Sequence, residues 1–351
     1  MSYITKPRFA HPHLPVNALG LTRRDYEGAM STLCAGCGHD SISAAIIQAC
    51  AEVSMPPHRV AKLSGIGCSS KTPTYFLSKS HGFNSVHGRM PSIATGANLA
   101  NRDLAYIGIS GDGDTASIGL GQFCHAVRRQ LNMMYIVENN GTYGLTKGQL
   151  SATADHGARS KVGEVNLYEA IDLVSLAVQL GASFVGRSFS GDKEQLVPMI
   201  KAALSHDGFA FIDVISPCVT FNNHVGSTKS FEYVREHNLA LNKPDFVPVR
   251  DEITASYEPD STHEVTLHDG SVVHLHKLSE EFDPTDRVAV LNTLQEHERR
   301  GEIPTGIVYI NPEMPELHEI IQTVEQPLNS LTEKDLCPGI DALEAINASL
   351  R

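Results

Sequence analysis

One stretch near the middle of the chain, residues 104–149, constrains the fold more than any other. Residues 104–109 form a short apolar segment with Gly111 just beyond it, and residues 133–137 are also short and apolar. Both segments are therefore predicted to be buried strands of a parallel sheet. The intervening residues 115–130 have helical spacing, so the stretch predicts a strand, helix and strand in succession.

The predicted helix has apolar residues near one face and cations in its last turn, where they suit the helix dipole. The residues expected on the apolar face are Ile118, Phe123, Ala126 and Val127, and the cations are Arg128 and Arg129. A right-handed crossover makes the two strands parallel, so their carboxyl ends open on the same edge of the sheet.

Two polar side chains follow these strand ends. Asp112 lies in the run Gly111-Asp112-Gly113-Asp114, where glycine lets backbone amides approach a phosphate at a helix amino end. Asn140 follows the second strand. One carboxylate, one amide oxygen and a backbone carbonyl just past Asn140 would give Mg²⁺ three protein ligands, and two diphosphate oxygens and a water would complete an octahedron.

The spacing GDG-x25-NN resembles the diphosphate and magnesium motif of thiamin diphosphate enzymes. A GDG triplet alone is weak, because tight strand-to-helix turns use it for conformational reasons. The surrounding strand, helix and strand make the resemblance specific. It implies that Asp112, Asn140 and the carbonyl of Thr142 hold the magnesium ion.

The composition excludes some classes of protein. The net charge of -12 argues against nucleic acid as a partner, because such binding depends on neutralised phosphates. The first residues lack an apolar signal region, and no stretch approaches the about 18 apolar residues of a membrane helix. We expect a soluble, cytoplasmic protein without a membrane partner.

The alternation of strands and helices continues on both sides of the central stretch and predicts an α/β fold with a doubly wound, mainly parallel sheet. Further strands are expected at residues 59–64, 183–188 and 209–216, and further helices near residues 41–53, 92–101, 168–180 and 193–205. Ligands of such folds bind at the carboxyl ends of strands, where Cys68, Asp112, Asn140 and Cys218 fall.

We divide the chain into an amino-terminal arm (1–30), a core (31–218) and a carboxyl-terminal extension (219–351). In the extension, residues 265–274 alternate around Asp-Gly, which predicts a β-hairpin. A helix is expected at residues 286–300 and a strand at 306–310. The apolar side of the helix near residues 288–294 could pack on a partner or equally on its own sheet.

The seven cysteines are an odd number in a long chain, so a disulfide framework is not expected. The C-x2-C pair Cys34 and Cys37 fits a zinc half-site or a thiol redox pair when taken alone. A ferredoxin-type run of cysteines is lacking, so a cluster would need distant positions. Cys50 and Cys124 lie in expected helices and are interpreted as core thiols.

The sequences CAGCGH, GIGCSSK and ISPC together resemble the β subunit of 2-oxoacid:ferredoxin oxidoreductases. The resemblance runs from about residue 33 to 218 and includes His87-Gly88-Arg89 and residues 143–149. It implies one 4Fe-4S cluster bound by Cys34, Cys37, Cys68 and Cys218. Cys337, which precedes a proline, competes for the fourth place.

The same resemblance implies the other site residues. Lys71 and His87 would be catalytic, and Lys71 would meet the oxoacid carboxylate together with Leu145 and Lys147. The residues expected around thiamin diphosphate are Ile66, Gly67, Cys68, Ser69, His87, Gly111, Asp112, Gly113, Asp114, Asn140, Thr142, Gly144, Leu145 and Thr146. Asn139 departs mildly from the pattern, because Asp is frequent there.

The implied reaction is the oxidative decarboxylation of a 2-oxoacid with coenzyme A, with electrons leaving through the cluster to ferredoxin, or the reverse fixation of CO2. The run YGLTKGQLSAT favours 2-oxoglutarate over pyruvate. A partner α chain would complete the cofactor pocket, in an αβ unit that pairs again. Alternatives are a pyruvate enzyme and a thiamin-dependent decarboxylase or synthase without electron transfer.

Overall fold

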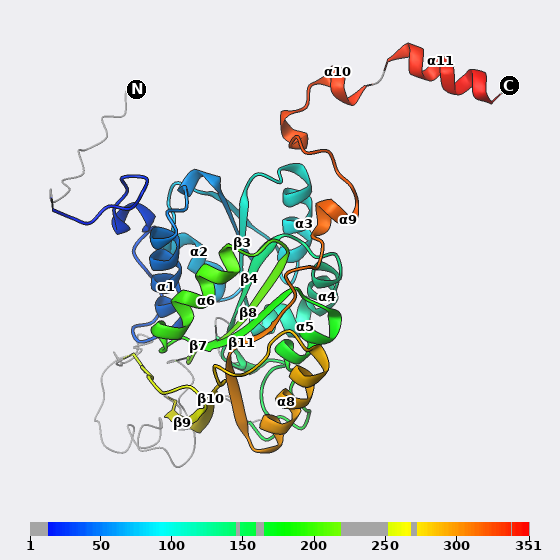
Figure 1. Ribbon diagram of the computed structural model, residues 1–351. Coiled ribbons are helices and arrows are strands. Elements are labelled where there is room, and N and C mark those ends of the chain that lie inside the picture. Colours follow the sequence, from blue (N-terminus) through cyan, green and yellow to red (C-terminus); the bar gives the residue numbers. More distant parts are fainter. Residues whose placement is uncertain are drawn as a thin grey trace, which may run out of the picture.

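The computed structural model describes residues 13–144, 148–158, 165–218, 252–267, 272–337 and 339–350. Nine strands form one sheet in the order β2-β1-β3-β4-β8-β7-β11-β10-β9 (Figure 1). The strands from β2 to β7 are all parallel, β11 is antiparallel to β7, and β9 is antiparallel to β10. The predicted doubly wound, mainly parallel α/β fold is confirmed.

The sheet strands are β1 (Val60–Ser64), β2 (His81–Asn84), β3 (Ala105–Gly111), β4 (Met133–Asn139), β7 (Phe184–Phe189), β8 (Phe209–Ile215), β9 (Ser261–Thr266), β10 (Val272–Lys277) and β11 (Glu302–Ile310). A separate two-stranded sheet pairs β5 (Thr142–Tyr143) with β6 (Gln149–Leu150). The helices are α1 (Gly38–Glu52), α2 (Thr72–Tyr75), α3 (Met90–Ala100), α4 (Leu120–Arg128), α5 (Leu173–Leu180), α6 (Lys193–Leu204), α8 (Arg287–Arg299), α9 (Leu317–Ile320), α10 (Glu333–Leu336) and α11 (Ile340–Ser349).

Two apolar cores lie on opposite faces of the sheet, because successive side chains of a buried strand point to opposite faces. On β4, Tyr135 and Val137 join the core covered by α3, α4, α5 and α8. Met134 and Ile136 join the core covered by α1 and α6. The two layers of helices are visible on either side of the sheet in Figure 1.

The central strand–helix–strand unit is confirmed, with one local difference. The helix begins as a π-helical turn, η4 (Gly113–Ile118), in which Gly119 N donates to the Asp114 carbonyl at 2.9 Å. The wider turn changes which residues face the sheet. Phe123, Ala126 and Val127 are buried as expected, but Ile118 is 44% exposed, so its predicted place on the apolar face is wrong.

The predicted helix at residues 168–180 is also shorter than expected, because α5 begins only at Leu173. Asp172 caps it, accepting a hydrogen bond from Val174 N at 3.0 Å. The same carboxylate forms an ion pair with Arg187 of β7. This cap fixes the start of the helix, while residues 168–172 remain nonhelical.

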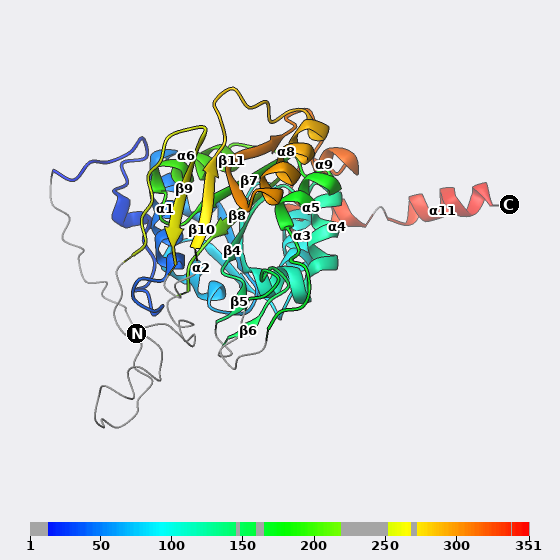
Figure 2. The same ribbon diagram turned by 90° about the horizontal axis from the view of Figure 1, so that it is seen from below.

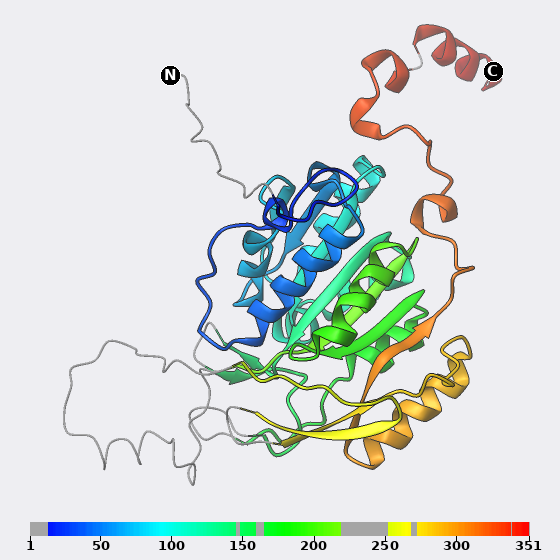
Figure 3. The ribbon, with the colours of Figure 1, turned by 60° about the vertical axis from the view of Figure 1, so that its left-hand side comes forward.

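The carboxyl-terminal residues extend the sheet of the core. The predicted hairpin is present as β9 and β10, although its tip, residues 268–271, lies outside the described residues. Figure 3 shows the hairpin at the end of the sheet with α8 beside it. In α8, Val290 and Leu294 are buried in the chain's own core while Val288 is 68% exposed, so this helix packs on its own sheet.

The described segments nearest the two chain ends differ in how they attach to the core. Tyr26, in the 3₁₀ turn η1 (Arg23–Tyr26), is fully buried and attaches the arm to the core. At the other end, α10 and α11 lead away from the body in Figures 1 and 2. Among the described residues, every helix is too short or too polar to cross a lipid bilayer.

Candidate active site

A cavity opens at the carboxyl ends of β1, β3 and β4, where the fold predicts a ligand. Most residues predicted to surround the cofactor line it, together with three that were not predicted, His39, Glu138 and Tyr143. The predicted residues in the wall are Ile66, Gly67, Cys68, Ser69, His87, Gly111, Asp112, Gly113, Asp114, Asn140, Thr142 and Gly144. Leu145, Thr146 and Lys147 lie outside the described residues.

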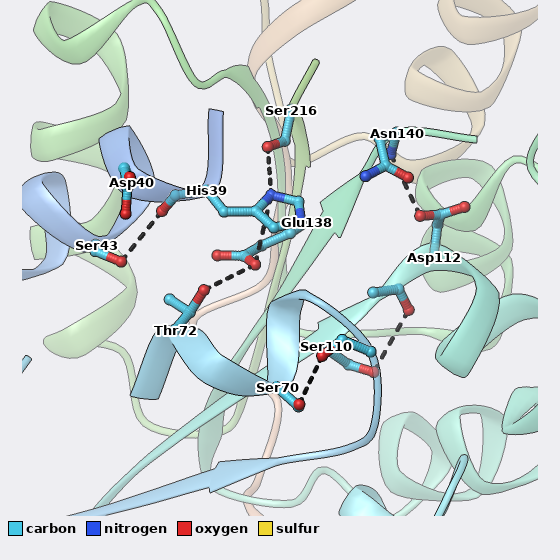
Figure 4. A network of polar contacts seen from close by, with 12 residues as sticks. His39, Asp40, Ser43, Ser70, Thr72, Ser110, Asp112, Glu138, Asn140 and Ser216 are labelled. Atoms are coloured by element: carbon cyan, nitrogen blue, oxygen red, sulfur yellow. Dashed lines mark hydrogen bonds and ion pairs between the residues drawn. The ribbon is translucent and has the colours of Figure 1, made fainter. Parts of the chain in front are cut away.

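The three predicted magnesium ligands lie together in this wall. Asp112 is 1% exposed and accepts hydrogen bonds from the Ser151 hydroxyl, from Thr153 Oγ1 at 2.8 Å and from Asn140 N at 3.3 Å. Asn140 Oδ1 accepts from Thr142 N at 3.1 Å. Figure 4 shows Asp112 and Asn140 side by side.

The surroundings of Asp112 suit a bound cation. Burial raises the pKa of this carboxyl, and the hydrogen bonds around it oppose the shift only in part. Among the described residues, no basic side chain forms an ion pair with Asp112, although its carboxylate is buried. A divalent cation would supply the missing charge, so the residues fit magnesium and the diphosphate that it would carry.

Asp114 joins two loops of the cavity wall. Its Oδ1 accepts from Gly88 N at 2.8 Å and its Oδ2 accepts from Ser110 Oγ at 2.9 Å. The carboxylate also lies against Gly65, where an added Cβ would be 1.8 Å from Oδ2. Asp114 therefore holds the loop after β1 and the loop that carries His87 in one arrangement.

The four cysteines predicted to bind a cluster approach one another from three segments. Cys37 is the N-cap residue of α1, and its N–H donates to the Cys34 carbonyl at 3.0 Å, while Gly38 N donates to the Pro217 carbonyl at 3.3 Å. Burial, and then the nearby Cys218, raise the pKa of Cys37. Burial likewise raises the pKa of Cys68, with a further contribution from Cys34.

The other cysteines lie elsewhere. Cys337 is exposed and ends α10, in the segment that leads away from the body (Figure 1). Cys50 is fully buried in α1, as expected of a core thiol, and Cys124 is partly buried in α4. The geometry thus favours Cys218 over Cys337 as a neighbour of the other three.

A buried polar network that was not predicted from the sequence reaches the wall of the cavity through His39 and Glu138 (Figure 4). Glu138 is fully buried, and its Oε2 accepts from Thr72 Oγ1 at 3.0 Å. His39 Nδ1 lies 2.6 Å from Ser216 Oγ and 3.6 Å from Glu138 Oε2. Among the described residues, Glu138 Oε1 has no hydrogen-bond partner.

The contact between His39 and Glu138 lies in fully buried surroundings. Burial lowers the pKa of His39 to about 4 and raises the pKa of Glu138 well above its ordinary value. Burial thus disfavours the charged form of each group. A glutamate at the end of an apolar strand was the one sequence signal that could have indicated this network.

Asn139 contacts both Thr153, which is a neighbour of Asp112, and the adjacent strand β8. Its Nδ2 donates to Asp213 Oδ1 at 3.1 Å, and Asp213 in turn pairs with Arg187 at 3.3 Å. An aspartate at 139 would oppose one buried carboxylate with another. The departure from the usual Asp at this position thus matches the neighbouring Asp213.

The two predicted catalytic residues occupy different places. His87 is exposed and lines the cavity. Lys71 is partly buried at the end of the 3₁₀ turn η3 (Ser69–Lys71), close enough to Cys68 to lower its pKa, but it does not line the cavity. A substrate that reached Lys71 would therefore extend beyond the described wall.

Two family models match the chain. The model described as "Thiamine pyrophosphate enzyme, C-terminal TPP binding domain" matches residues 65–214, the span that holds the cavity. The model for the carboxyl-terminal part of the pyruvate ferredoxin oxidoreductase β subunit matches residues 272–326, which include β10, α8 and β11.

Similar proteins match the chain over most of its length or over about half of it. The β subunit of a 2-oxoacid:ferredoxin oxidoreductase from Sulfolobus sp is 35% identical over 312 residues, covering 89% of this chain and 90% of that protein. The 2-oxoglutarate oxidoreductase subunit KorB of Mycobacterium tuberculosis is 40% identical over 191 residues, covering 54% of this chain and 51% of that protein.

One solved structure is similar over nearly the whole chain. It is a 2-oxoglutarate:ferredoxin oxidoreductase from Magnetococcus marinus with 2-oxoglutarate, coenzyme A and succinyl-CoA bound. The TM-score is 0.70 and the identity 27%, covering 93% of this chain and 96% of the other.

Proposed function

The chain belongs to the family of 2-oxoacid:ferredoxin oxidoreductase β subunits, and from this premise we propose that it serves the coenzyme A-dependent oxidation of 2-oxoglutarate. The observation that carries the proposal is the convergence of two sets of residues. The expected magnesium ligands line the cavity, and the four expected cluster cysteines approach one another beside it.

In this proposal Asp112, Asn140 and the Thr142 carbonyl hold Mg²⁺ and through it the diphosphate. Thiamin diphosphate, when bound, supplies the electron sink that loss of CO2 from a 2-oxoacid requires. Gly67, Ser69 and Gly113 lie in the wall of the same cavity, where they bring the backbone close to the cofactor. The buried Glu138 and His39 lie in the wall of this cavity.

We assign the 4Fe-4S cluster to Cys34, Cys37, Cys68 and Cys218. Such a cluster, when bound, accepts and passes on single electrons, with ferredoxin as the final acceptor. The electrostatic contacts of Cys37 with Cys218 and of Cys68 with Cys34 support this set. Burial raises the pKa of the Cys37 and Cys68 thiols, so these two would release protons when they bind iron.

The relatives named for 2-oxoglutarate favour that substrate. Lys71 would meet its carboxylate, with Leu145 and Lys147 bordering the same space and His87 at the cavity. The match of residues 272–326 to the pyruvate ferredoxin oxidoreductase model makes pyruvate the second candidate. Profiling both oxoacids with coenzyme A and ferredoxin would decide between them, and higher kcat/KM for pyruvate would overturn the first choice.

We further propose that this chain supplies half of an active site. Its one doubly wound sheet is committed to the diphosphate end of the cofactor, and a partner α chain would cover the pyrimidine end. The test compares ferredoxin reduction by this chain alone with reduction after the partner is added. Equal turnover by the isolated, fully reconstituted chain would contradict the half-site proposal.

The cluster assignment has a direct test. Anaerobically purified protein should contain about four iron and four acid-labile sulfide per chain, the content of one cubane cluster. Cys218→Ala should lose the cluster and Cys337→Ala should keep it. Stoichiometric zinc without sulfide would instead favour a thiamin-dependent enzyme without electron transfer.

A further inference from the structure

A second group of ligand-type side chains lies in the carboxyl-terminal part of the molecule. His276 belongs to β10, His297 to the last turn of α8, and Glu302 begins β11. One nitrogen or oxygen from each residue lies within 4.8 Å of the others. The rings of the two histidines are 4.4 Å apart, centroid to centroid.

Hydrogen bonds orient these side chains. Thr262 Oγ1 donates to Glu302 Oε1 at 3.2 Å and lies 2.9 Å from His276 Nδ1. A hydroxyl has one proton, so His276 Nδ1 is the donor in the second contact. His297 Nδ1 lies 2.8 Å from Glu302 Oε2 and donates to that carboxylate. His276 therefore keeps its lone pair on Nε2, and an ion shared by His297 Nδ1 and Glu302 Oε2 would take the place of the proton between those two atoms.

A fourth group completes the cluster. Asp260 has φ of +58°, and its largely exposed side chain places Oδ1 3.9 Å from His276 Nε2. With the lone pair of His276 on Nε2, no proton lies between these two atoms. The separation is too long for a hydrogen bond, but it is close to the spacing of about 3.4 Å between two ligands around a tetrahedral Zn²⁺ with bonds of about 2.1 Å.

We propose that His276, His297, Glu302 and Asp260 bind a divalent cation of the zinc class. Imidazole and carboxylate together suit Zn²⁺, Co²⁺ and Ni²⁺, whereas Mg²⁺ and Ca²⁺ prefer oxygen ligands alone. The ion would connect the β9–β10 hairpin to α8 and β11. It is independent of the cysteines and of the magnesium ligands.

The local electrostatics agree with metal binding. Burial, and then the neighbouring His297, lower the pKa of His276. Glu302 and Asp260 oppose this shift, while the cation of Arg300 adds to it. The negative charges of Glu302 and Asp260 thus offset the positive charge of Arg300 beside the site.

The test uses the full chain in complex with its partner, with the iron–sulfur cluster reconstituted so that the cysteines are occupied. Co²⁺ alone is the probe, because nitrogen and oxygen ligands give visible absorption without the near-ultraviolet band of a cobalt–thiolate bond. We expect one Co²⁺ per chain, displaced by Zn²⁺, and a Tm raised by Zn²⁺.

Matched variants decide whether these residues bind the ion. His276→Ala and His297→Gln should weaken Co²⁺ binding by at least about 10-fold and remove the Zn²⁺-dependent rise in Tm. His263→Ala is the control, because His263 lies in the same hairpin but stacks on Tyr257. Unchanged iron content and circular dichroism would show that each variant is folded.

Asp260→Asn keeps the proposal testable if the two histidine variants fail to fold, because the Asp260 side chain is exposed. It should weaken Co²⁺ binding while leaving iron content and Tm of the metal-free protein unchanged. The proposal is overturned if the complex binds no stoichiometric Co²⁺ or if the bound ion has thiolate absorption. It is also overturned if Asp260→Asn and a folded histidine variant both bind Co²⁺ as tightly as the parent protein. The residues would then be a hydrogen-bonded group only.

Discussion

Replacing Gly65 by alanine should destabilise the protein through a residue 49 positions away, Asp114. The new Cβ would lie 1.8 Å from Asp114 Oδ2, so the buried carboxylate must move. The φ angle of Gly65 is outside the left-handed region, so lack of space rather than backbone strain is responsible. Movement of this carboxylate weakens its hydrogen bonds from Gly88 N and Ser110 Oγ.

The magnitude follows from those two bonds. Each hydrogen bond to a charged group contributes about 1.5 to 3 kcal/mol, so their loss costs roughly 3 to 6 kcal/mol. Replacing glycine by alanine returns about 0.4 to 1 kcal/mol by restricting the unfolded chain. The free energy of unfolding should therefore fall by about 2 to 5 kcal/mol.

Urea unfolding of the cofactor-free protein, followed by circular dichroism, measures this change. Gly82→Ala is the matched control, because a Cβ there meets no atom within 4 Å. Its effect should stay within about 0.5 kcal/mol. Gly65→Ala should also weaken the binding of magnesium and thiamin diphosphate, since Asp114 holds two loops of the cavity. Parent-like stability and affinity in Gly65→Ala would refute this role of Asp114.

Three other substitutions probe the same region. Asp112→Ala should severely weaken cofactor binding in a magnesium titration while the cluster stays, because it removes the one ligand charge assigned to the ion. The raised pKa of Glu138 makes the folded parent lose stability as pH rises above about 4.5, because the unfolded chain then releases the proton more readily. Glu138→Gln should remove this loss, so its stability relative to the metal-free parent should rise by up to about 1.4 kcal/mol per pH unit. Urea unfolding at pH 5 and 8 checks the sign. Asn139→Asp should cost about 3 kcal/mol at pH 8 and less at pH 5, where Asp213, with a pKa raised by burial to about 6, takes up a proton. An equal cost of Asn139→Asp at both pH values would contradict the electrostatic explanation.

The sequence predicted those parts of the site that follow from local pattern. The strands before Cys68, Asp112 and Asn140 are short and apolar, and parallel topology then brings their ends together. The contact between His39 and Ser216 could not be predicted in this way, because 177 positions separate the two residues. Partners so distant depend on how whole elements pack.

Two other differences between the predicted and the observed structure have local physical causes. The spacing of apolar residues along the sequence does not reveal these causes. Ile118 is exposed because a π-helical turn precedes α4, and a pattern with 3.6 residues per turn does not include such a turn. The antiparallel pairing of β11 with β7 was not predicted either. An apolar strand near residue 306 is compatible with either direction of its neighbour.

The pairing of β11 with β7 has a consequence for any attempt to shorten this protein. All six residues of β7 are buried, and without β9, β10 and β11 its edge would present unpaired backbone groups to other molecules. The described sheet instead ends in two strands poorly suited to adding another copy: β2, which is only four residues long, and the polar β9. A version of the chain that stops at residue 218 would keep the four cysteines and the magnesium ligands, yet it should aggregate during expression.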